Sequence, residues 1–471
     1  MTVLRRHSVR RSAFLAAALG LAACATALPN VTPADIPRLQ QEIAASPDNT
    51  DLQVQLGMAQ FGAGEFETAR ATLQGAVDAG NESGPALLHL GMVQEELEDW
   101  AAARDAYDRY LTVGASADTR EEVRKRLTLI GRNLLHAQAQ QALTQEAQIA
   151  GAADVTPQSV AVLPLAFNST RSDLEPLIYA LSDMMVTDFS VSNALVVLER
   201  AQIQALLDEM SLTSSGYAEA TTGARAGRLL RAEHVFQGVL TTLGENDLQT
   251  DANILNVPNA SSAGQITESA VLEQLFDMEK AIVIRTIREV LAVELTPAEE
   301  QAILENRMGN VLAFLAYGRG LRELDQGNYE AAQAEFELSF QLEPGGFDSR
   351  DAAMADVADL IDATSSTTVD LAGLASTTGE FGVGFLAPPT AATTNDLFVS
   401  PTLTTATEAV APSPTGATLD LGTTRQAQDQ ATSQTQDTNR DPVQESTGRE
   451  TVSGAIGAII RIVISNPGGE E

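Results

Sequence analysis

The chain has 471 residues, enough for two or three domains, and 63 Asp and Glu against 29 Lys and Arg give it a net charge of −34. So acidic a surface repels the phosphates of nucleic acids and anionic lipid headgroups, which argues against a nucleic-acid partner. The single cysteine, Cys24, excludes an intrachain disulfide.

The first 23 residues have the features of a secretory signal peptide. Four arginines between positions 5 and 11 precede an apolar stretch over 13–23. A basic start followed by a short apolar core and small residues is typical of export signals. The apolar stretch is about half as long as a helix that spans a bilayer, so it is not expected to be a mature membrane span.

Cys24 is the predicted lipidation site. The run Leu21-Ala22-Ala23-Cys24 resembles the bacterial lipobox, which implies cleavage before Cys24 and acylation of its thiol and new N-terminus. Each buried CH₂ contributes ~0.8 kcal/mol, so several acyl chains give lasting attachment. Ala25, where an Asp would mark retention, resembles sorting to the outer membrane, with the protein facing the periplasm. The cleaved chain has 25 basic and 63 acidic residues, a charge near −38. A stray cysteine in an apolar segment is the alternative.

Residues 24–150 carry a period of 34 residues. The run 56–60, Leu-Gly-Met-Ala-Gln, recurs at 90–94 as Leu-Gly-Met-Val-Gln. This resembles the tetratricopeptide repeat, a pair of antiparallel helices of ~34 residues. A generic helical pair with coincidental spacing is the alternative. Two units are fewer than a stable stack needs, so residues 33–45 and a helix over 119–148 are expected to cap them. The predicted packing positions are Leu56, Gly57, Ala69, Leu90, Gly91 and Ala103.

Residues 155–295 alternate between predicted strands and helices. The segments 159–165, 195–198 and 235–240 are short, apolar and rich in β-branched residues, as buried strands are. Helical patterns lie between them, and a strand over 248–255, a turn and a last short strand precede a long helix over 268–293. Strands that alternate with helices predict a mixed α/β sheet.

Four segments of this region resemble the curli-secretion (CsgG-like) lipoprotein family, whose α/β core is shared with the TolB N-terminal domain and with lipoprotein activators of penicillin-binding proteins. The segments are 160–164, 181–185, 196–200 and 232–238. The resemblance implies that Glu199-Arg200 opens a helix as part of the fold and is not a catalytic pair. Channel-forming members insert two long hairpins into this core. Here 244–247 and 257–265 are short and polar, which favours a scaffold over a channel.

Residues 296–347 contain a third repeat unit, and 348–471 form a low-complexity tail. The predicted packing positions of the unit are Gly320, Ala332, Phe336 and Pro344. In the tail a short helix over 351–361 is expected, followed by disorder, because the composition is polar and of low complexity. Two apolar segments stand out. Phe381–Leu386 is either a docking motif or a buried turn, and Ile459–Ile464 is expected to dock on the folded body or on another subunit.

The sequence lacks the usual catalytic motifs. It contains no His-Glu-x-x-His pair, no phosphate-binding loop and no Gly-x-Ser-x-Gly elbow. His89, His136 and His234 are expected to be structural. We therefore expect no enzyme, no cofactor and no metal site.

The predicted fold is a pair of tetratricopeptide hairpin regions flanking a CsgG-like or TolB-like mixed α/β domain, with a disordered tail. The predicted function is that of a lipid-anchored scaffold or adaptor in cell-envelope assembly or secretion. It would bind protein partners through its repeat helices and its α/β domain, and self-association is left open. The alternatives are a component of a ring-forming curli-type secretion channel and an enzyme with an unrecognised site.

Overall fold

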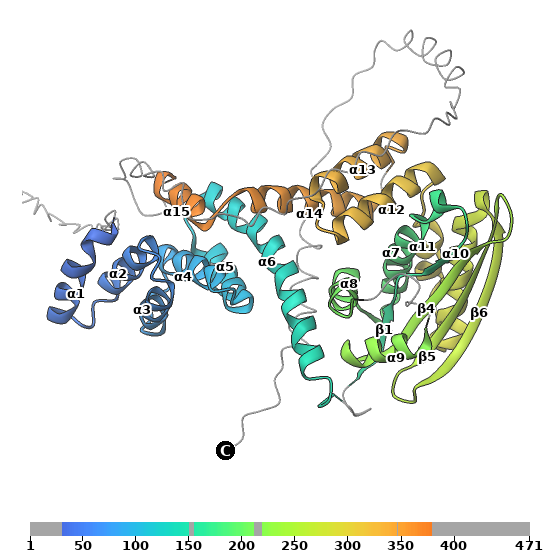
Figure 1. The fold of residues 1–471 in the computed structure, drawn as a ribbon, viewed down its shortest axis with the longest axis horizontal. Coiled ribbons are helices and arrows are strands. Elements are labelled where there is room, and N and C mark those ends of the chain that lie inside the picture. Colours follow the sequence, from blue (N-terminus) through green and yellow to red (C-terminus); the bar gives the residue numbers. More distant parts are fainter. Residues whose placement is uncertain (1–30, 150–154, 212–218, 346, 379–471) are drawn as a thin grey trace, which may run out of the picture. The chain divides into compact units, whose positions relative to one another are not determined.

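The computed structural model describes residues 31–149, 155–211, 219–345 and 347–378 (Figure 1). Within these ranges helical hairpins flank a mixed α/β sheet, which confirms the predicted combination of repeats and sheet. The predictions on Cys24, Phe381–Leu386 and Ile459–Ile464 concern residues outside the described ranges.

The N-terminal region is a stack of antiparallel helices. α2 pairs with α3 and α4 with α5, while α1 packs on α2 and α6 packs on α5, as expected of caps. The hairpin turn requires a left-handed backbone: Gly64 has φ +75°, and Glu98, 34 residues later, adopts φ +57°. The helices are α1 (Ile36–Ala45), α2 (Thr50–Gly62), α3 (Phe66–Asp78), α4 (Gly84–Glu96), α5 (Trp100–Val113) and α6 (Ala117–Thr144).

One sheet of six strands forms the centre of the α/β region. Its order is β3-β1-β4-β5-β6, and β2 also pairs with β4. β1 runs parallel to β3 and β4, whereas β4, β5 and β6 form an antiparallel meander. The strands are β1 (Thr156–Val162), β2 (Ala166–Asn168), β3 (Val196–Val197), β4 (Ala232–Thr242), β5 (Asp247–Asn256) and β6 (Ser261–Val271).

Helices cover both faces of the sheet. Alternate residues of β1 separate the two cores: Val160 and Val162 join the core under α7 and α10, whereas Ala161 joins the core under α8 and α9. The helices are α7 (Leu177–Ser190), α8 (Arg200–Glu209), α9 (Ala220–Leu229) and α10 (Leu275–Arg285), which continues as a π-helix over Thr286–Val290.

The last strand and the following helix divide differently from the prediction. β6 continues to Val271 and α10 begins only at Leu275, whereas the sequence pattern placed a helix from residue 268. Pairing along the whole of β5, down to Asp247 opposite Val271, holds residues 268–271 in the sheet. Local apolar spacing could not reveal this pairing because it depends on a partner strand.

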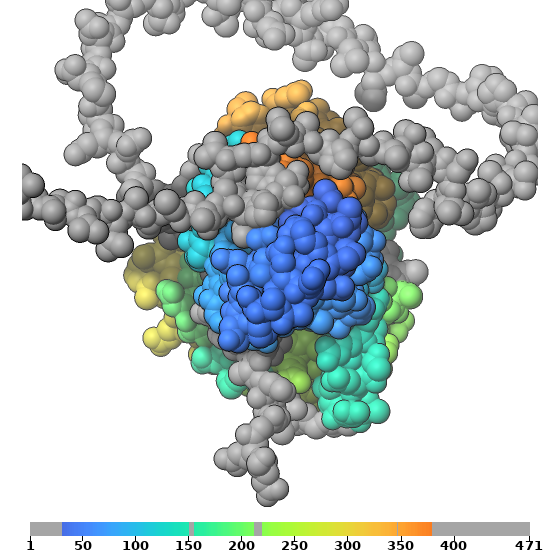
Figure 2. Space-filling model, turned by 90° about the vertical axis from the view of Figure 1, so that its left-hand side faces the viewer, coloured from blue at the N-terminus to red at the C-terminus, as the bar shows by residue number. Residues whose placement is uncertain are grey.

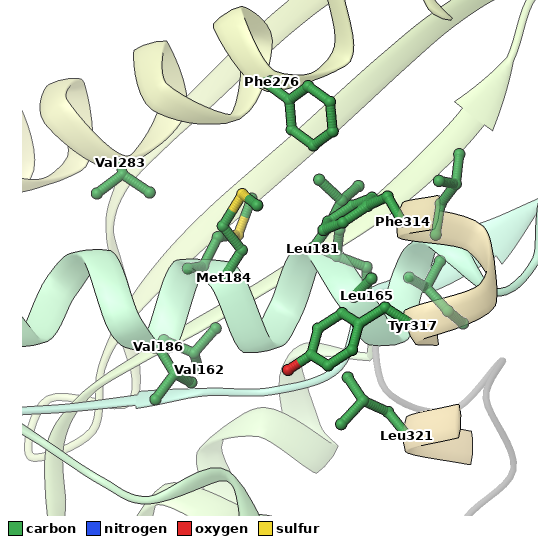
Figure 3. Close-up of a cluster of buried hydrophobic side chains, with 14 of the residues drawn as sticks. Val162, Leu165, Leu181, Met184, Val186, Phe276, Val283, Phe314, Tyr317 and Leu321 are labelled. Atoms are coloured by element: carbon green, nitrogen blue, oxygen red, sulfur yellow. The ribbon is translucent and has the colours of Figure 1, made fainter. Parts of the chain in front are cut away.

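The third repeat unit packs directly on the α/β region. Phe314 and Tyr317 of α12 lie beside Leu181 of α7 and Phe276 of α10 in one apolar cluster (Figure 3). Gly318 allows this approach, because a Cβ there would lie 2.0 Å from the backbone oxygen of Pro176. The unit comprises α11 (Pro297–Glu305), α12 (Val311–Asp325) and α13 (Tyr329–Leu342).

Residues 348–377 differ from the expected tail. They form α14 (Asp348–Ser365) and α15 (Thr368–Thr377), and α15 lies in a segment that was expected to be disordered. α14 packs along α6 and α13, and α15 packs on α6 and α4. A sparse apolar stripe drives this packing, since Val357, Leu360, Leu371 and Ala375 are at most 1% exposed. The stripe could not be recognised from the composition of the segment, because many Ala, Asp, Ser and Thr residues lie between its apolar members.

Candidate functional site

The structure places the predicted packing glycines against large side chains of the next helix. Each glycine stands 16 residues before its partner, and a Cβ would come far inside contact distance. The pairs and Cβ distances are Gly57–Leu73 (2.4 Å), Gly91–Tyr107 (2.5 Å) and Gly320–Phe336 (2.3 Å). Of the other predicted positions, Leu56, Ala69, Leu90, Ala103 and Ala332 are buried, and Pro344 is exposed just after α13.

Helices α2, α4 and α6 carry equivalent stripes of side chains. On α2 the stripe is Val54, Met58 and Phe61, whose spacing puts them on one side of the helix. The stripes of α4 and α6 follow at intervals of 34 residues, and we call all nine residues the repeat face. The further members are Leu88, Met92 and Glu95 on α4, and Glu122, Arg126 and Leu129 on α6.

The segment that leads into α15 binds the polar part of the repeat face. Ser366 Oγ donates a hydrogen bond to Glu122 at 2.7 Å, and Arg126 Nη1 donates to Ser366 Oγ at 3.0 Å. At the other end of α15, the hydroxyls of Thr119 and Thr378 lie 3.0 Å apart. These contacts fix both ends of α15 beside α6. In Figure 2 the N-terminal helices (blue) face the viewer, with orange α15 visible beside them.

Arg126 joins α15 to a buried ion pair between α6 and α4. Its side chain is 3% exposed, and its Nε donates to Glu95 Oε2 at 3.1 Å. The hydroxyl of Tyr107 on α5 donates to the same oxygen at 2.9 Å. The carboxylate therefore receives hydrogen bonds from two helices, which offsets the cost of its burial.

A second buried network joins the sheet domain to the third repeat unit. Arg200, at the start of α8, donates from Nη1 and Nη2 to Asp325 of α12 at 2.7 and 2.8 Å, and its Nε lies 3.4 Å from Asp183 of α7. The Tyr317 hydroxyl donates to Asp183 at 2.6 Å. Burial raises the pKa of Asp325 to about 6, against the attraction of Arg200. Arg200 is therefore the member of the predicted fold signature Glu199-Arg200 that connects these helices.

A third buried cluster lies between α7 and α10. Lys280 pairs with Asp188, and its Nζ is 2.9 Å from Glu279 Oε2. The side chain of Asn306 donates to Asp188 at 2.6 Å. All three charged residues are at most 2% exposed. In a buried site it is energetically unfavourable for both carboxyls beside a single ammonium to ionise. Burial raises the pKa of Glu279 to about 8.

Glu279→Gln should therefore flatten the dependence of stability on pH. A carboxyl whose pKa is raised by folding stabilises the protein fully below its unfolded pKa, here near 4.5, and this contribution is lost as pH rises through the folded value near 8. The glutamine amide does not titrate, so the variant has no corresponding loss of stability between about pH 4.5 and pH 8. We expect the stability of the variant relative to the parent to rise by roughly 1–3 kcal/mol between pH 5 and pH 8 in urea titrations. A constant difference across this range would contradict the assignment.

The described ranges show no arrangement for metal chemistry. Within them no group of three or more His, Cys, Asp or Glu could hold a metal ion. His89 is buried with Nδ1 2.9 Å from the Pro85 oxygen, and burial lowers its pKa to about 4. His136 lies 3.4 Å from Glu209. A hollow of about 590 Å³ between α1, α2 and α3 has one ionisable side chain in its lining, Asp48.

Comparison with known proteins identifies the sheet region. Residues 132–252, from the second half of α6 into β5, match the family model of the curli production assembly/transport component CsgG. The α/β domain is CsgG-like. The match confirms the resemblance read from the four sequence segments, and it covers about a quarter of the chain. A comparison with curated proteins gave no match.

Solved structures give weaker likenesses. Lipoprotein GNA1162 from Neisseria meningitidis is 14% identical over 29% of this chain and 99% of that chain, with a TM-score of 0.23. The LpoB C-terminal domain from Salmonella enterica is 7% identical over 27% and 91%, with a TM-score of 0.21. A tetratricopeptide repeat protein from Parabacteroides merdae is 12% identical over 69% and 91%, with a TM-score of 0.19. Scores this low do not establish a shared fold.

Sequence analysis missed most of the repeat face and the partners of Arg200. The period itself could have found the apolar members, since Leu88 and Met92 follow Val54 and Met58 at the repeat interval. No local signal could have found the bond between Arg126 and Ser366, because 240 residues separate them. None of the helices in the described part of the chain is long and apolar enough to cross a membrane.

Proposed function

We propose that this chain is a lipid-anchored adaptor of the cell envelope that binds protein partners and has no enzymatic activity. The observation that carries the proposal is α6, a helix of 28 residues that belongs to both parts of the molecule. It packs against α5, α14 and α15 of the helical regions and against α8 of the CsgG-like domain. Arg132 of α6 also donates to the Leu324 oxygen of α12 at 3.1 Å. The helical regions and the CsgG-like domain, which are the two proposed surfaces for partners, thus belong to one packed unit.

An exposed apolar patch on the third repeat unit offers one such surface. Leu312 is 62% exposed and Leu342 is 39% exposed. The two helices meet there, because the Asn310 side chain donates to the Leu342 oxygen at 3.2 Å. Leu338, one turn before Leu342, is 39% exposed. Apolar side chains gathered on one surface are a common mark of protein binding sites.

The test is crosslinking of the lipidated chain in intact cells, followed by capture from the envelope. We expect a defined envelope protein to be captured by the parent and lost from the Leu312→Ser/Leu342→Ser variant. Leu243→Ser is the matched control, since Leu243 is 60% exposed in the turn after β4. Equal recovery from all three proteins would overturn the assignment of this patch, and recovery of no protein above background would overturn the adaptor.

Within the residues that the structure describes, no specific observation favours the channel alternative. The turns 243–246 and 257–260, which join β4 to β5 and β5 to β6, have four residues each, and residues 261–265, expected as part of a turn, lie in β6. Light scattering on residues 25–471 separates the two proposals. A stable ring of many subunits that conducts ions in planar bilayers would support the channel and contradict the adaptor.

Attachment to the outer membrane, facing the periplasm, depends on Cys24. Cys24→Ser should abolish lipidation, because no other cysteine exists to accept the acyl chain. Cells fed an alkyne fatty acid should label the parent and not the variant, and the variant should leave the membrane fraction or stay uncleaved. Equal label on both proteins would rule out this site of attachment.

A further inference from the structure

Helix α15 is attached to the N-terminal repeats by few buried side chains. Of its ten residues, the buried ones are Thr368, Leu371 and Ala375, whereas Val369 on its outer side is 67% exposed. Leu371 and Ala375 lie in the same buried cluster as Met92 of α4. They are four residues apart and therefore share one side of the helix. This narrow apolar contact resembles the way in which a peptide helix binds to a protein surface.

The chain also forms α15 as a helix separate from α14. α14 ends at Ser365, and Ser366 follows with an extended backbone at φ −108° and ψ 151°. Thr367 and Asp370 then form a capping box, in which each side chain accepts a hydrogen bond from the backbone N–H of the other residue. These bonds close the N-terminus of α15 without any group of α14. α15 can therefore detach from the repeats while α14 stays packed.

The polar groups beneath α15 keep their partners without it. The buried Arg126 is paired with Glu95, and the hydroxyl of Tyr107 donates to the same carboxylate; all three belong to the repeats. Two further carboxylates accept hydrogen bonds from α15 and the residue before α14 gives way to it. These are Glu122, which is half-buried, and Glu96, which is exposed, so water can replace those bonds. Detachment of α15 thus leaves no buried charge without a partner.

The apolar contact, in contrast, has to be replaced. Removal of Leu371 and Ala375 exposes apolar surface of the repeats to water, so detachment is favourable when another helix takes the same place. The hydroxyl of Thr368 donates a hydrogen bond to the Glu96 carboxylate. A lysine or arginine at that place would donate a charge-assisted hydrogen bond, which is stronger. The surface therefore suits a helix with a leucine, an alanine four residues later and a basic residue three before the leucine.

We propose that α15 is an exchangeable ligand of the N-terminal repeats. It occupies the surface of α4 and α6 that receives a helix of a partner protein, and the partner helix, with the pattern just given, has to displace it. A tethered ligand acts at an effective concentration in the millimolar range, so α15 excludes helices that bind more weakly than it does. The proposal rests on the adaptor function, because it names a kind of partner and the contact that regulates its binding.

The first test compares the opening of α15 with the opening of the repeats. Residues 25–471 contain no cysteine, so Ala375→Cys and, in a separate protein, Ala103→Cys each give a single thiol. Both alanines are fully buried in one cluster, but Ala103 lies on α5 inside a repeat hairpin. We expect maleimide to label position 375 at least tenfold faster, because only α15 has to detach. Equal rates would overturn the proposal, since α15 would then open only together with the repeats.

The second test adds a competitor for the surface. An excess of a synthetic peptide spanning 364–378 should raise the labelling rate of the Ala375→Cys protein further, because it binds the open form and shifts the population toward it. The same peptide with Leu371→Asp is the matched control and should have no effect. Labelling that neither peptide changes would make α15 a loose helix without a binding site, and equal acceleration by both peptides would show an effect that is not specific. Either result overturns the proposal.

The basic residue assigned to the partner has its own test. A peptide with Thr368→Lys should accelerate labelling at a lower concentration than the natural peptide, and a higher concentration would contradict that assignment. Should a cysteine variant fail to fold, hydrogen exchange of the unsubstituted chain compares amides 371–377 with amides 103–110, with and without the peptides. Neither measurement involves capture from the envelope, so this proposal and the adaptor function can fail separately.

Discussion

Replacing Arg200 with leucine should lower the free energy of unfolding by roughly 3–5 kcal/mol, the usual cost of removing one partner from a buried ion pair. Arg200 is 15% exposed and is the cation for both Asp183 and Asp325, which are 16% and 8% exposed. Without it, two carboxyls remain in a site where burial already raises their pKa. Urea denaturation of residues 25–471, followed by circular dichroism, measures the loss.

The matched control for this prediction is Arg307→Leu. Arg307 and its partner Asp277 lie 2.9 Å apart but are 52% and 69% exposed. Water and salt screen such pairs, so the variant should change stability by less than about 1 kcal/mol. A loss for Arg200→Leu no larger than that of the control would mean that the network between α7, α8 and α12 does not hold the CsgG-like domain to the third repeat unit.

Gly91→Ala should destabilise the N-terminal repeats by ~1–3 kcal/mol through overpacking, although alanine is the better helix former. The new methyl would lie 2.5 Å from the Tyr107 ring. This ring is fully buried, and its hydroxyl is bound to Glu95, so it cannot move away without breaking that hydrogen bond. Thermal melts of residues 25–471 provide the measurement.

Gly75→Ala is the control for this substitution. Gly75 lies inside α3, and a Cβ there meets no heavy atom within 4 Å. The Gly75→Ala variant should gain up to about 1 kcal/mol of stability from helix propensity alone. If Gly91→Ala also stabilises the protein, the result would contradict the close packing of α4 on α5.

The sequence by itself determined the repeats and the sheet. The period of 34 places Gly57 and Gly91 against α3 and α5, because small and large residues alternate at helix contacts whatever surrounds the hairpin. The apolar runs around Val160 and Val235 predicted strands. The four segments that resemble the CsgG-like family identified the α/β domain. Both signals could be read from the sequence because they are local. The start of α10 was misplaced because 268–271 suit a helix or a strand, and only β5 decides between them.

Only the tertiary structure decided how these parts are joined. Helix α15 looked like disordered tail, because its apolar content is low and its order comes from Leu371 and Ala375 packing with α4 and α6. Arg200 was visible as a signature, but its role depends on Asp325, which lies 125 residues away. Contacts of this range leave no periodic trace in the sequence. They arise when separately predictable elements meet, and they decide which helices hold the repeats to the CsgG-like domain.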